Sequence, residues 1–575
     1  MLILYNFSDC RIFIFALYSS INQKMRFQTI VLFLSLLCSI SANAQNMADY
    51  TGGWEGKIED SKIFNLKVEI DNLGLENPTF RISNGKNIIN YPIEIENNLQ
   101  INISFAENHL FEGVLSENGK EINGFIKSGL LLYHLKLNKS KSHSYRGVWN
   151  ILMVEELKSQ NFYLSVENGS GNDYQAYPVF GDNRFTGTWC DNFQKENDLI
   201  SFTDVKTGLQ FRGKLESNGI RLEMFLGKYP ITQIELKKSV TDWEIGGFKP
   251  DHKTFSLQLP ELENLLSKDS LPNTHSVLVS RSGKLIYENY YDGYDANIPH
   301  DMRSASKSIS SAIVGIAKDK SLFNNVDQSI FDFLPKEYQV YRDSLKSKID
   351  IKSLLTMSSG LDAVDFGIQR RSLASEDNYQ PTQDWTKTIF QAPMINEPNA
   401  HANYGSANPY LLGVAMNTVV SEPLEVFMDK NLFQKLAISN YIIQTDMTGL
   451  PYFGGGMYLT PRDMLKFGEL YLNNGNWKGQ QILSEDWIND SFKNYHVLEN
   501  TIDKNGYGYL LWHNTYPVNG KRLESIEARG AGGQYIFIIP ELKLVVVITS
   551  GNYRNGNTQQ PELILENYIL PYIEN

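Results

Sequence analysis

The chain has 575 residues, more than one ordinary domain holds, so we expect two or three folded units. Hydrophobic residues make up 42% and aromatic residues 12% of the chain, a composition that is typical of globular proteins and excludes a broadly disordered or fibrous one. The formal net charge of -12 opposes general binding to nucleic acids or anionic membranes, because like charges repel.

Residues 1–44 are predicted to be an N-terminal extension followed by a secretory signal peptide. Met25-Arg26 forms a basic start, residues 30–40 are apolar, and Ala42-Asn43-Ala44 has the small-x-small form of a signal-peptidase site. The apolar segment is shorter than the roughly 20 residues that span a bilayer, so we expect no membrane span in the mature chain, with a retained anchor as the alternative. The sequence therefore predicts an exported protein, periplasmic or extracellular, whose true start is Met1 or Met25.

The chain contains three cysteines, and two of them, Cys10 and Cys38, fall in the segment to be removed. Lipidation of Cys38 is an alternative, although the residues before it do not match the usual signal. Cys190 remains in the mature chain, so no intrachain disulfide is expected. We interpret Cys190 as a packed small hydrophobic residue.

Residues 46–240 consist of short alternating apolar segments broken by Gly, Asn and Asp, a pattern that predicts antiparallel strands. The pattern repeats, which indicates two β modules over residues 46–140 and 141–240. Tyr50-Thr-Gly-Gly-Trp54 recurs as Tyr145-Arg-Gly-Val-Trp149, and Phe111-Glu-Gly-Val-Leu115 recurs as Phe211-Arg-Gly-Lys-Leu215. An Asn-Gly pair follows each second motif and favours a hairpin turn. Contact with a glycan, the cell wall or a partner is one interpretation; a structural appendage is the favoured one, because no polar constellation stands out.

We place a domain boundary between Val240 and His252, where the β repeat has ended. Residues 253–575 then form a second unit in which helical patterns alternate with strands. Strand pairs are expected at 275–291 and 534–549, and helices at 304–318 and 561–572. This order predicts an α+β domain with an antiparallel sheet flanked by helices.

Ser304-Ala-Ser-Lys307 opens a helix of small and apolar residues, which predicts burial on most sides. Positions three apart share a helix face, so Lys307 can approach the Ser304 hydroxyl, and burial disfavours its charged form. Unpaired N–H groups at the helix start favour an attacking alkoxide at Ser304. The alternative is a helix-capping serine with a lysine that reaches solvent, because Ser-x-x-Lys is a short motif.

Five further segments follow in order, and with them residues 270–570 resemble the serine β-lactamase and penicillin-binding protein superfamily, in particular its class C-related esterases and peptidases. The segments are Leu354–Leu361, Tyr404–Gly413, Gly454–Asp463, Gly506–Trp512 and Gly530–Gln534. The resemblance implies a penicillin-recognising fold in which Ser304 is acylated. It also implies that a tyrosine of a Tyr-x-Ser or Tyr-x-Asn motif acts with Lys307 as general base.

Tyr404 with Ser406 matches this second motif. A nearby lysine ammonium is expected to lower the pKa of the phenol, so that either Tyr404 or Lys307 takes the serine proton. Ser406 and Asn408 are candidates to orient substrate, or they cap the helix that begins near Pro409.

The third family motif, Lys-Thr-Gly beside the active site, is missing at the expected place. Lys206-Thr-Gly208 precedes the nucleophile by almost a hundred residues and is interpreted as a hairpin turn of the β region. After Tyr404 the expected place holds Ala531-Gly532-Gly533, and Arg529 is a candidate to replace the missing cation, because side chains two apart on a strand point the same way. By family analogy, Gly532 and Gly533 leave room for substrate, and the N–H groups of Ser304 and Gln534 form the oxyanion hole.

These patterns predict a secreted serine hydrolase that acts on ester or peptide-like amide bonds through an acyl-enzyme, with a small-molecule or peptide-like substrate. No metal ion or organic cofactor is implied, and no nucleic-acid partner is expected. One alternative is a catalytically silent protein that senses cell-wall fragments or a protein partner. Another is a β-lactamase or D-aminopeptidase proper.

Overall fold

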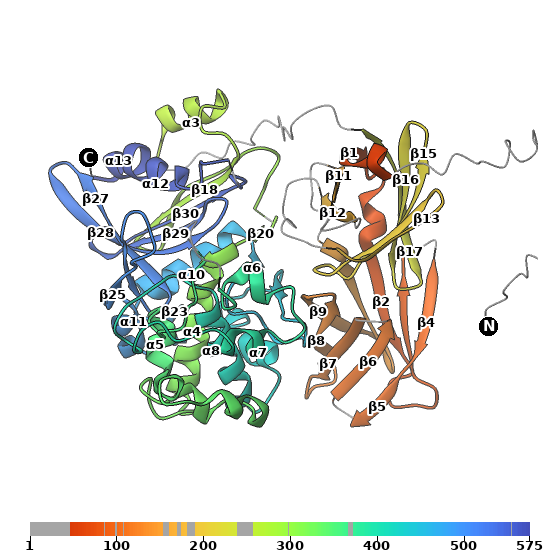
Figure 1. The fold of residues 1–575 in the computed structure, drawn as a ribbon, viewed down its shortest axis with the longest axis horizontal. Helices are drawn as coiled ribbons and strands as arrows, with labels where there is room; N and C mark the ends of the chain where they lie inside the picture. The colour runs from red at the N-terminus through yellow and green to blue at the C-terminus, as the bar shows by residue number, and fades with distance from the viewer. Residues whose placement is uncertain are drawn as a thin grey trace, which may run out of the picture.

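The computed structural model describes residues 47–574 except 85–86, 98–99, 107–108, 153–159, 169–173, 181–189, 239–256, 297, 366–371 and 554. The predicted signal peptide and the predicted boundary at 240–252 lie outside these residues. Figure 1 shows two bodies side by side, a β-rich N-terminal region (47–238) and a mixed C-terminal domain (257–574). Among the described residues no single helix is long and apolar enough to cross a membrane; one helix pair, 407–419 with 424–433, meets the length and apolarity test but is bent by 91°.

The N-terminal region is built from two antiparallel sheets. The first has the order β12 (Tyr174–Phe180), β11 (Asn161–Asn168), β1 (Gly52–Lys57), β17 (Tyr229–Lys238), β16 (Gly219–Leu226), β15 (Gln210–Glu216), β14 (Leu199–Asp204), β13 (Cys190–Glu196). The second has the order β4 (Ile88–Pro92), β3 (Thr79–Ser83), β2 (Asn65–Asp71), β10 (Ser144–Asn150), β9 (Leu131–Lys141), β8 (Glu121–Ser128), β7 (His109–Leu115), β6 (Gln100–Ala106), β5 (Glu94–Asn97). Two short 3-10 helices, η1 (Met47–Tyr50) and η2 (Ser61–Phe64), accompany them.

The sequence repeat corresponds to these sheets, but the two copies exchange their first strands. β1 carries Trp54 of the first Tyr-Trp motif and pairs with β11 and β17 of the second copy. β10 carries the second motif and pairs with β2 and β9 of the first copy. Both sheets contribute to one buried cluster that includes Trp54, Phe111, Trp149 and Phe211. The boundary at residue 140 therefore divides the repeat in sequence, while the packing joins both copies.

The predicted hairpins of the N-terminal region are present. β7 pairs with β8, and β15 pairs with β16 through a turn at Ser217-Asn218. Lys206-Thr-Gly208 forms the turn between β14 and β15, as the sequence predicted. Cys190 begins β13, where its Sγ accepts a hydrogen bond from the Ala176 N–H at 3.1 Å.

The C-terminal domain has a central antiparallel sheet, as predicted. Its order is β19 (Lys284–Tyr290), β18 (Thr274–Arg281), β30 (Leu544–Ser550), β29 (Gln534–Ile539), β28 (Lys521–Gly530), β27 (Leu511–Val518), β26 (Gly506–Gly508), β25 (His496–Val497). Both faces are covered: Val545 and Val547 of β30 belong to the core beneath α4 and α10, while Val546 and Ile548 pack with the terminal helices. Alternate strand residues thus enter two cores, because successive side chains point to opposite faces.

Helices cover the two faces of this sheet and build a second, helical lobe (Figure 1). The α-helices and π-turns are α3 (Pro260–Ser267), α4 (Ser306–Asp319), α5 (Ile351–Leu355), α6 (Glu376–Tyr379), α7 (Trp385–Phe390), α8 (Ala407–Val419), α9 (Leu424–Met428), η8 (Asp429–Phe433), α10 (Pro461–Leu472), α11 (Glu485–Ser491), α12 (Gln560–Ile564), η10 (Leu565–Ile569) and α13 (Leu570–Glu574). The 3-10 turns are η4 (Arg303–Ala305), η5 (Ile330–Asp332), η6 (Lys336–Tyr341), η7 (Lys346–Lys348) and η9 (Pro540–Leu542), and β23 (Asn476–Trp477) pairs with β24 (Gln480–Gln481).

The two bodies share a hydrogen-bonded ladder. Strand β9 of the N-terminal region pairs with β21 (Ile442–Gln444), which pairs with β22 (Met457–Leu459), which in turn pairs with β20 (His300–Asp301). The second N-terminal sheet therefore continues into the C-terminal domain and ends three residues before Ser304.

Candidate active site

Ser304 lies in the 3-10 turn η4, directly before the buried helix α4. The predicted helix is present, although its regular part begins at Ser306. The Ser306 hydroxyl donates to Arg303 O at 2.8 Å and closes the turn that presents Ser304. The nucleophile candidate therefore stands at a helix start, where unpaired N–H groups favour negative charge.

Lys307 is only 1% exposed and contacts the Ser304 side chain, as the spacing predicted. Its Nζ donates to Ser304 Oγ at 2.8 Å and to Gly454 O at 2.5 Å. The Nζ also lies 5.1 Å from the centre of the Tyr404 ring. The geometry excludes the alternative in which this lysine reaches solvent, and places its nitrogen between serine and tyrosine.

Tyr404 is buried beside this pair and packs on two aromatic side chains, at 6.1 Å from Tyr507 and 5.1 Å from Trp512 between ring centres. The sequence led us to expect a lowered pKa for the phenol, and this expectation is wrong. Burial raises the pKa of Tyr404 above its usual value, and Lys307 opposes this effect only in part. A phenolate in this site would lose more solvation than one ammonium restores.

A cavity of about 1020 Å³ opens above these groups. Its lining includes Ser304, Tyr404, Ser406, Asp365, Glu376, Asn500, Ile502, Trp512, Arg529, Gly530 and Ala531. Ser304, Tyr404 and the strand end of β28 thus meet at one opening, which is large enough for a small-molecule substrate.

The two candidates for substrate orientation near Tyr404 differ in their surroundings. Ser406 lines the cavity, and its buried Oγ has no hydrogen-bond partner within the described residues, so a substrate can satisfy it. Asn408 lies inside α8 and is not among the cavity residues; its side-chain amide donates to Gly405 O at 3.0 Å. The structure thus favours the local, helix-start role for Asn408 over substrate contact.

Arg529 lines the cavity but carries a compensated charge. Its Nε lies 2.6 Å from Glu527 Oε2 and its Nη1 lies 3.3 Å from Glu562 Oε1. The guanidinium packs 5.1 Å from the Trp512 ring and 5.7 Å from the Tyr535 ring. Arg529 occupies the neighbourhood expected for the family's clamp, yet two carboxylates neutralise it.

Gly532 and Gly533, at the place of the third motif, are required by backbone conformation and packing and do not line the cavity. Gly532 and Gly533 have φ of 82° and 88°, where side chains are disfavoured, and neither is among the cavity residues. A Cβ on Gly532 would lie 2.3 Å from the Tyr553 ring. Gln534 pairs with Gly530 in the β28–β29 ladder, and its side chain donates to Ser550 O away from the cavity.

Gly530 and Ala531 are the residues of this strand end that face the nucleophile. A Cβ on Gly530 would lie 2.1 Å from Met302 O and 3.2 Å from Ala305 N, so β28 approaches the η4 turn backbone to backbone. Ala531 follows directly, is exposed and lines the cavity. This close approach requires glycine at position 530.

Among the cavity residues that the sequence analysis did not single out are Asp365, Glu376 and Asn500. Asp365 accepts from the N–H of Ser406 at 2.6 Å and from the N–H of Glu376 at 3.0 Å. Glu376 accepts from the Tyr452 hydroxyl at 2.5 Å; burial and Asp365 raise its pKa, while Lys307 opposes the rise. No local sequence pattern predicts these residues, because each forms hydrogen bonds with a different segment of the chain.

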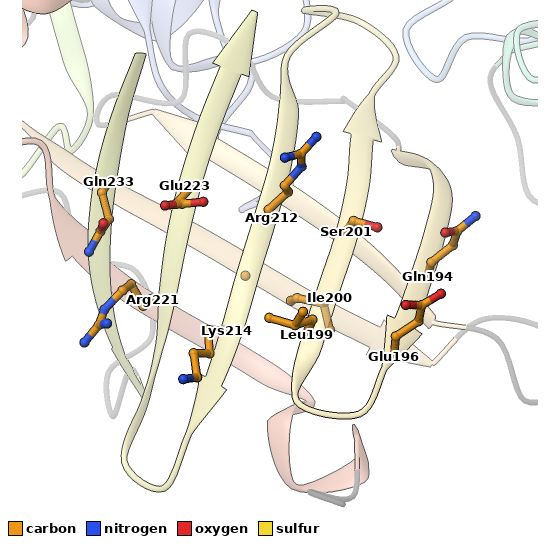
Figure 2. Close-up of a pocket in the computed structure, with 11 residues that line it drawn as sticks. Gln194, Glu196, Leu199, Ile200, Ser201, Arg212, Lys214, Arg221, Glu223 and Gln233 are labelled. Atoms are coloured by element: carbon orange, nitrogen blue, oxygen red, sulfur yellow. The ribbon is translucent and has the colours of Figure 1, made fainter. Parts of the chain in front are cut away.

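A second hollow, of about 530 Å³, lies on the outer face of β13 to β17. Figure 2 shows Arg212, Lys214, Arg221 and Glu223 spread along neighbouring strands rather than converging on one point. Every charged side chain that lines it is exposed, and Arg221 pairs with Glu216 and Glu235. We therefore assign the chemistry to the cavity at Ser304.

The C-terminal domain is similar to known proteins. Residues 273–566 match the Beta-lactamase family. The 6-aminohexanoate-dimer hydrolase of Paenarthrobacter ureafaciens is 24% identical over 243 residues, which cover 40% of this chain and 59% of that protein. Beta-lactamase-like protein 4 of Dictyostelium discoideum is 24% identical over 278 residues, with coverage of 40% and 47%. The chain thus spans about half the length of these two relatives.

Among solved structures, a D-stereospecific amidohydrolase from Streptomyces shares 14% identity at a TM-score of 0.41, covering 52% of this chain and 95% of that one. A Bacteroides dorei protein described as a candidate beta-lactamase shares 16% identity at a TM-score of 0.45, covering 56% of this chain and all of that one.

Proposed function

Because the chain belongs to the Beta-lactamase family, we propose that it hydrolyses ester or peptide-like amide bonds through an acyl-enzyme on Ser304. One observation carries the proposal: Lys307 Nζ lies 2.8 Å from Ser304 Oγ on the wall of a cavity that Tyr404 also lines. A nucleophile in hydrogen-bond contact with a buried base is the arrangement that acyl transfer requires.

The reaction proceeds in two halves. Ser304 Oγ bonds to the substrate carbonyl carbon while its proton passes to Lys307 Nζ. The bond to the leaving group then breaks, and a proton passes through Tyr404 to the leaving oxygen or nitrogen. A water oxygen then bonds to the acyl carbon while one of its protons passes to Lys307. The bond between that carbon and Ser304 Oγ breaks, Oγ takes the proton back, and the acid leaves. The raised pKa of Tyr404 favours these roles for Lys307 and Tyr404, because a phenol that stays protonated is better suited to donate a proton than to accept one.

We place the second oxyanion-hole donor at Ala531 instead of Gln534. Gly530 lies against the η4 turn, and Ala531 is the next residue and lines the cavity with Ser304. Gln534 is fully buried and belongs to the ladder behind it. Two backbone N–H groups that face one point stabilise the oxyanion formed when the serine attacks.

The compensated charge of Arg529 favours substrates without a carboxylate beside the scissile bond. A β-lactam antibiotic carries such a carboxylate, so we expect slow turnover of nitrocefin alongside measurable hydrolysis of short-chain p-nitrophenyl esters. Nitrocefin turnover as fast as ester turnover would contradict this substrate class.

The test of the mechanism is covalent labelling. Purified protein is treated with a fluorophosphonate probe and, separately, with a fluorescent penicillin, and the adduct is located by peptide mass. We expect the fluorophosphonate adduct on Ser304 and its loss in Ser304→Ala. Thr558→Ala, which removes another hydroxyl from the same cavity, is the matched control and should label normally. Absence of any adduct would favour the silent, binding protein.

We also propose that the protein is exported, on the signal-like pattern of residues 25–44. N-terminal sequencing of the protein from its native cells should then begin at Gln45. A mature chain that keeps residues 25–44 would contradict this proposal.

A further inference from the structure

We propose that the N-terminal region is a working part of the active site, and that Lys206 is a positioning residue which holds the turn carrying Ser304 through Asp301. The inference rests on the proposed function of Ser304 and deepens it. It also gives the N-terminal region a role that neither repeat motif suggests.

The first support is the shared ladder. Strand β9 pairs with β21 at Tyr133–Ile442, β21 pairs with β22, and β22 pairs with β20 at Tyr458–Asp301. The N–H of Met302 then donates to Met457 O at 2.9 Å. Backbone hydrogen bonds therefore run without interruption from the N-terminal sheet to the residue two before Ser304.

The second support is a buried ion cluster at the tip of the β14–β15 hairpin. Lys206 Nζ lies 3.4 Å from Asp301 Oδ2, and these side chains are 2% and 0% exposed. Asp301 Oδ2 also lies 3.2 Å from Arg303 Nε, and Asp301 Oδ1 accepts from the Arg303 N–H at 2.9 Å. One carboxylate thus joins a lysine of the N-terminal region to the residue that precedes the nucleophile.

The third support is the conformation of Arg303. Its φ is 49°, in the left-handed region that is unfavourable for a residue with a side chain. Asp301 contacts both the backbone N–H and the side chain of Arg303, so it holds this conformation in place. Without Lys206 the carboxylate would keep one cation instead of two in a buried site, where an under-compensated charge is costly.

The hairpin that carries Lys206 is itself fixed. Lys206 O accepts from the Leu130 N–H at 2.9 Å, and Thr207 O accepts from the Ser128 hydroxyl at 2.7 Å. A Cβ on Gly129 would lie 2.3 Å from Gly208 N, so the β8–β9 and β14–β15 turns pack backbone to backbone. Lys206 is therefore held at a set position by both copies of the repeat.

The same ladder also supports the partner of Lys307. The segment between β21 and β22 contains Gly454, whose carbonyl accepts from Lys307 Nζ. Gln444, the last residue of β21, donates its N–H to Gly456 O at 3.1 Å and accepts from the Tyr452 N–H at 2.8 Å. Both sides of the Ser304–Lys307 contact thus depend on strands that continue the N-terminal sheet.

The test compares lysine variants in the full-length protein. Lys206→Met keeps the apolar stem and removes the charge; we expect kcat to fall about tenfold to a hundredfold with little change in KM, because the turn loses alignment while the cavity persists. Lys206→Arg should restore most of kcat. Lys214→Met, an exposed lysine on β15, is the matched control and should leave kcat and KM unchanged.

The rate of fluorophosphonate labelling at Ser304 distinguishes failure of the proposed function from failure of the positioning role of Lys206. Absence of labelling in the unaltered protein would refute the proposed function itself. Normal labelling and normal kcat in a folded Lys206→Met would overturn the positioning role alone. If Lys206→Met does not fold, Lys206→Gln replaces it with the same expectations; if neither folds, Lys206 serves stability only and the positioning role is likewise overturned.

Discussion

The Asn500 side chain holds the backbone of Tyr404 through both of its polar atoms. The Tyr404 N–H donates to Asn500 Oδ1 at 2.7 Å, and Asn500 Nδ2 donates to Tyr404 O at 3.0 Å. Both residues line the cavity. Two hydrogen bonds on opposite sides of one residue restrict its rotation, so Asn500 sets where the phenol stands relative to Lys307.

Replacing Asn500 should therefore impair catalysis more than stability. We expect Asn500→Ala to lower kcat for a p-nitrophenyl ester about tenfold, since each lost hydrogen bond is worth about 1 kcal/mol. Asn500→Asp keeps the acceptor and should be intermediate. Asn505→Ala, in the same cavity wall, serves as control. An unchanged kcat in Asn500→Ala would show that other contacts position Tyr404.

The approach of β28 to the nucleophile turn predicts a contrast between two glycines. Gly530→Ala would place a Cβ 2.1 Å from Met302 O, whereas a Cβ on Gly455 would lie 3.5 Å from Arg303 O, an ordinary contact. We expect Gly530→Ala to lower kcat/KM at least about a hundredfold, because the turn must shift, and Gly455→Ala to remain active. Equal activities of the two variants would argue against this tight contact.

We expect the Arg529–Glu527 ion pair to contribute to the free energy of unfolding. Glu527 is fully buried, so Arg529→Met leaves a carboxylate with one cation fewer, and we expect a loss of about 3 kcal/mol in unfolding free energy measured with urea. Adding Glu527→Gln should recover part of that loss. Arg522→Met, exposed on the same strand, is the control and should change stability little. A stable Arg529→Met would indicate that Glu527 is protonated in the folded protein.

Because His275 is buried, we expect the folded protein to lose stability at acidic pH. Burial lowers its pKa to about 3, and the ring stacks on Tyr294 at 3.8 Å between ring centres. The unfolded chain takes up the proton near pH 6.5 and the folded chain only near pH 3. Stability therefore declines as the pH falls between these values.

At pH 4 the contribution of His275 to this decline is about 3 kcal/mol. His275→Phe retains the stacking and cannot titrate, so its unfolding free energy should change less between pH 7 and pH 4. The measurement is urea unfolding at both values. The prediction fails if the two proteins lose the same stability on acidification.

The sequence by itself determined the elements whose signals are local. Ser304 and Lys307 meet because residues three apart share a helix face, and short apolar runs bounded by turn residues place β18, β29 and β30 correctly. The internal repeat could also be recognised from the sequence, and the Lys206-Thr-Gly208 turn was correctly predicted to join two strands. Such features depend on neighbours in the chain, which a sequence displays directly.

Only the tertiary structure decided what these elements contact. Lys206 lies 95 residues from Asp301 in sequence, and Asn500 lies 96 residues from Tyr404, so no pattern could join them. The raised pKa of Tyr404 arises from burial by surrounding segments, and the glycine requirement at 530 arises from the backbone of another element. Desolvation and close packing depend on the whole fold. The sequence therefore could not predict that the β14–β15 turn, which contains Lys206, lies next to the turn that carries Ser304.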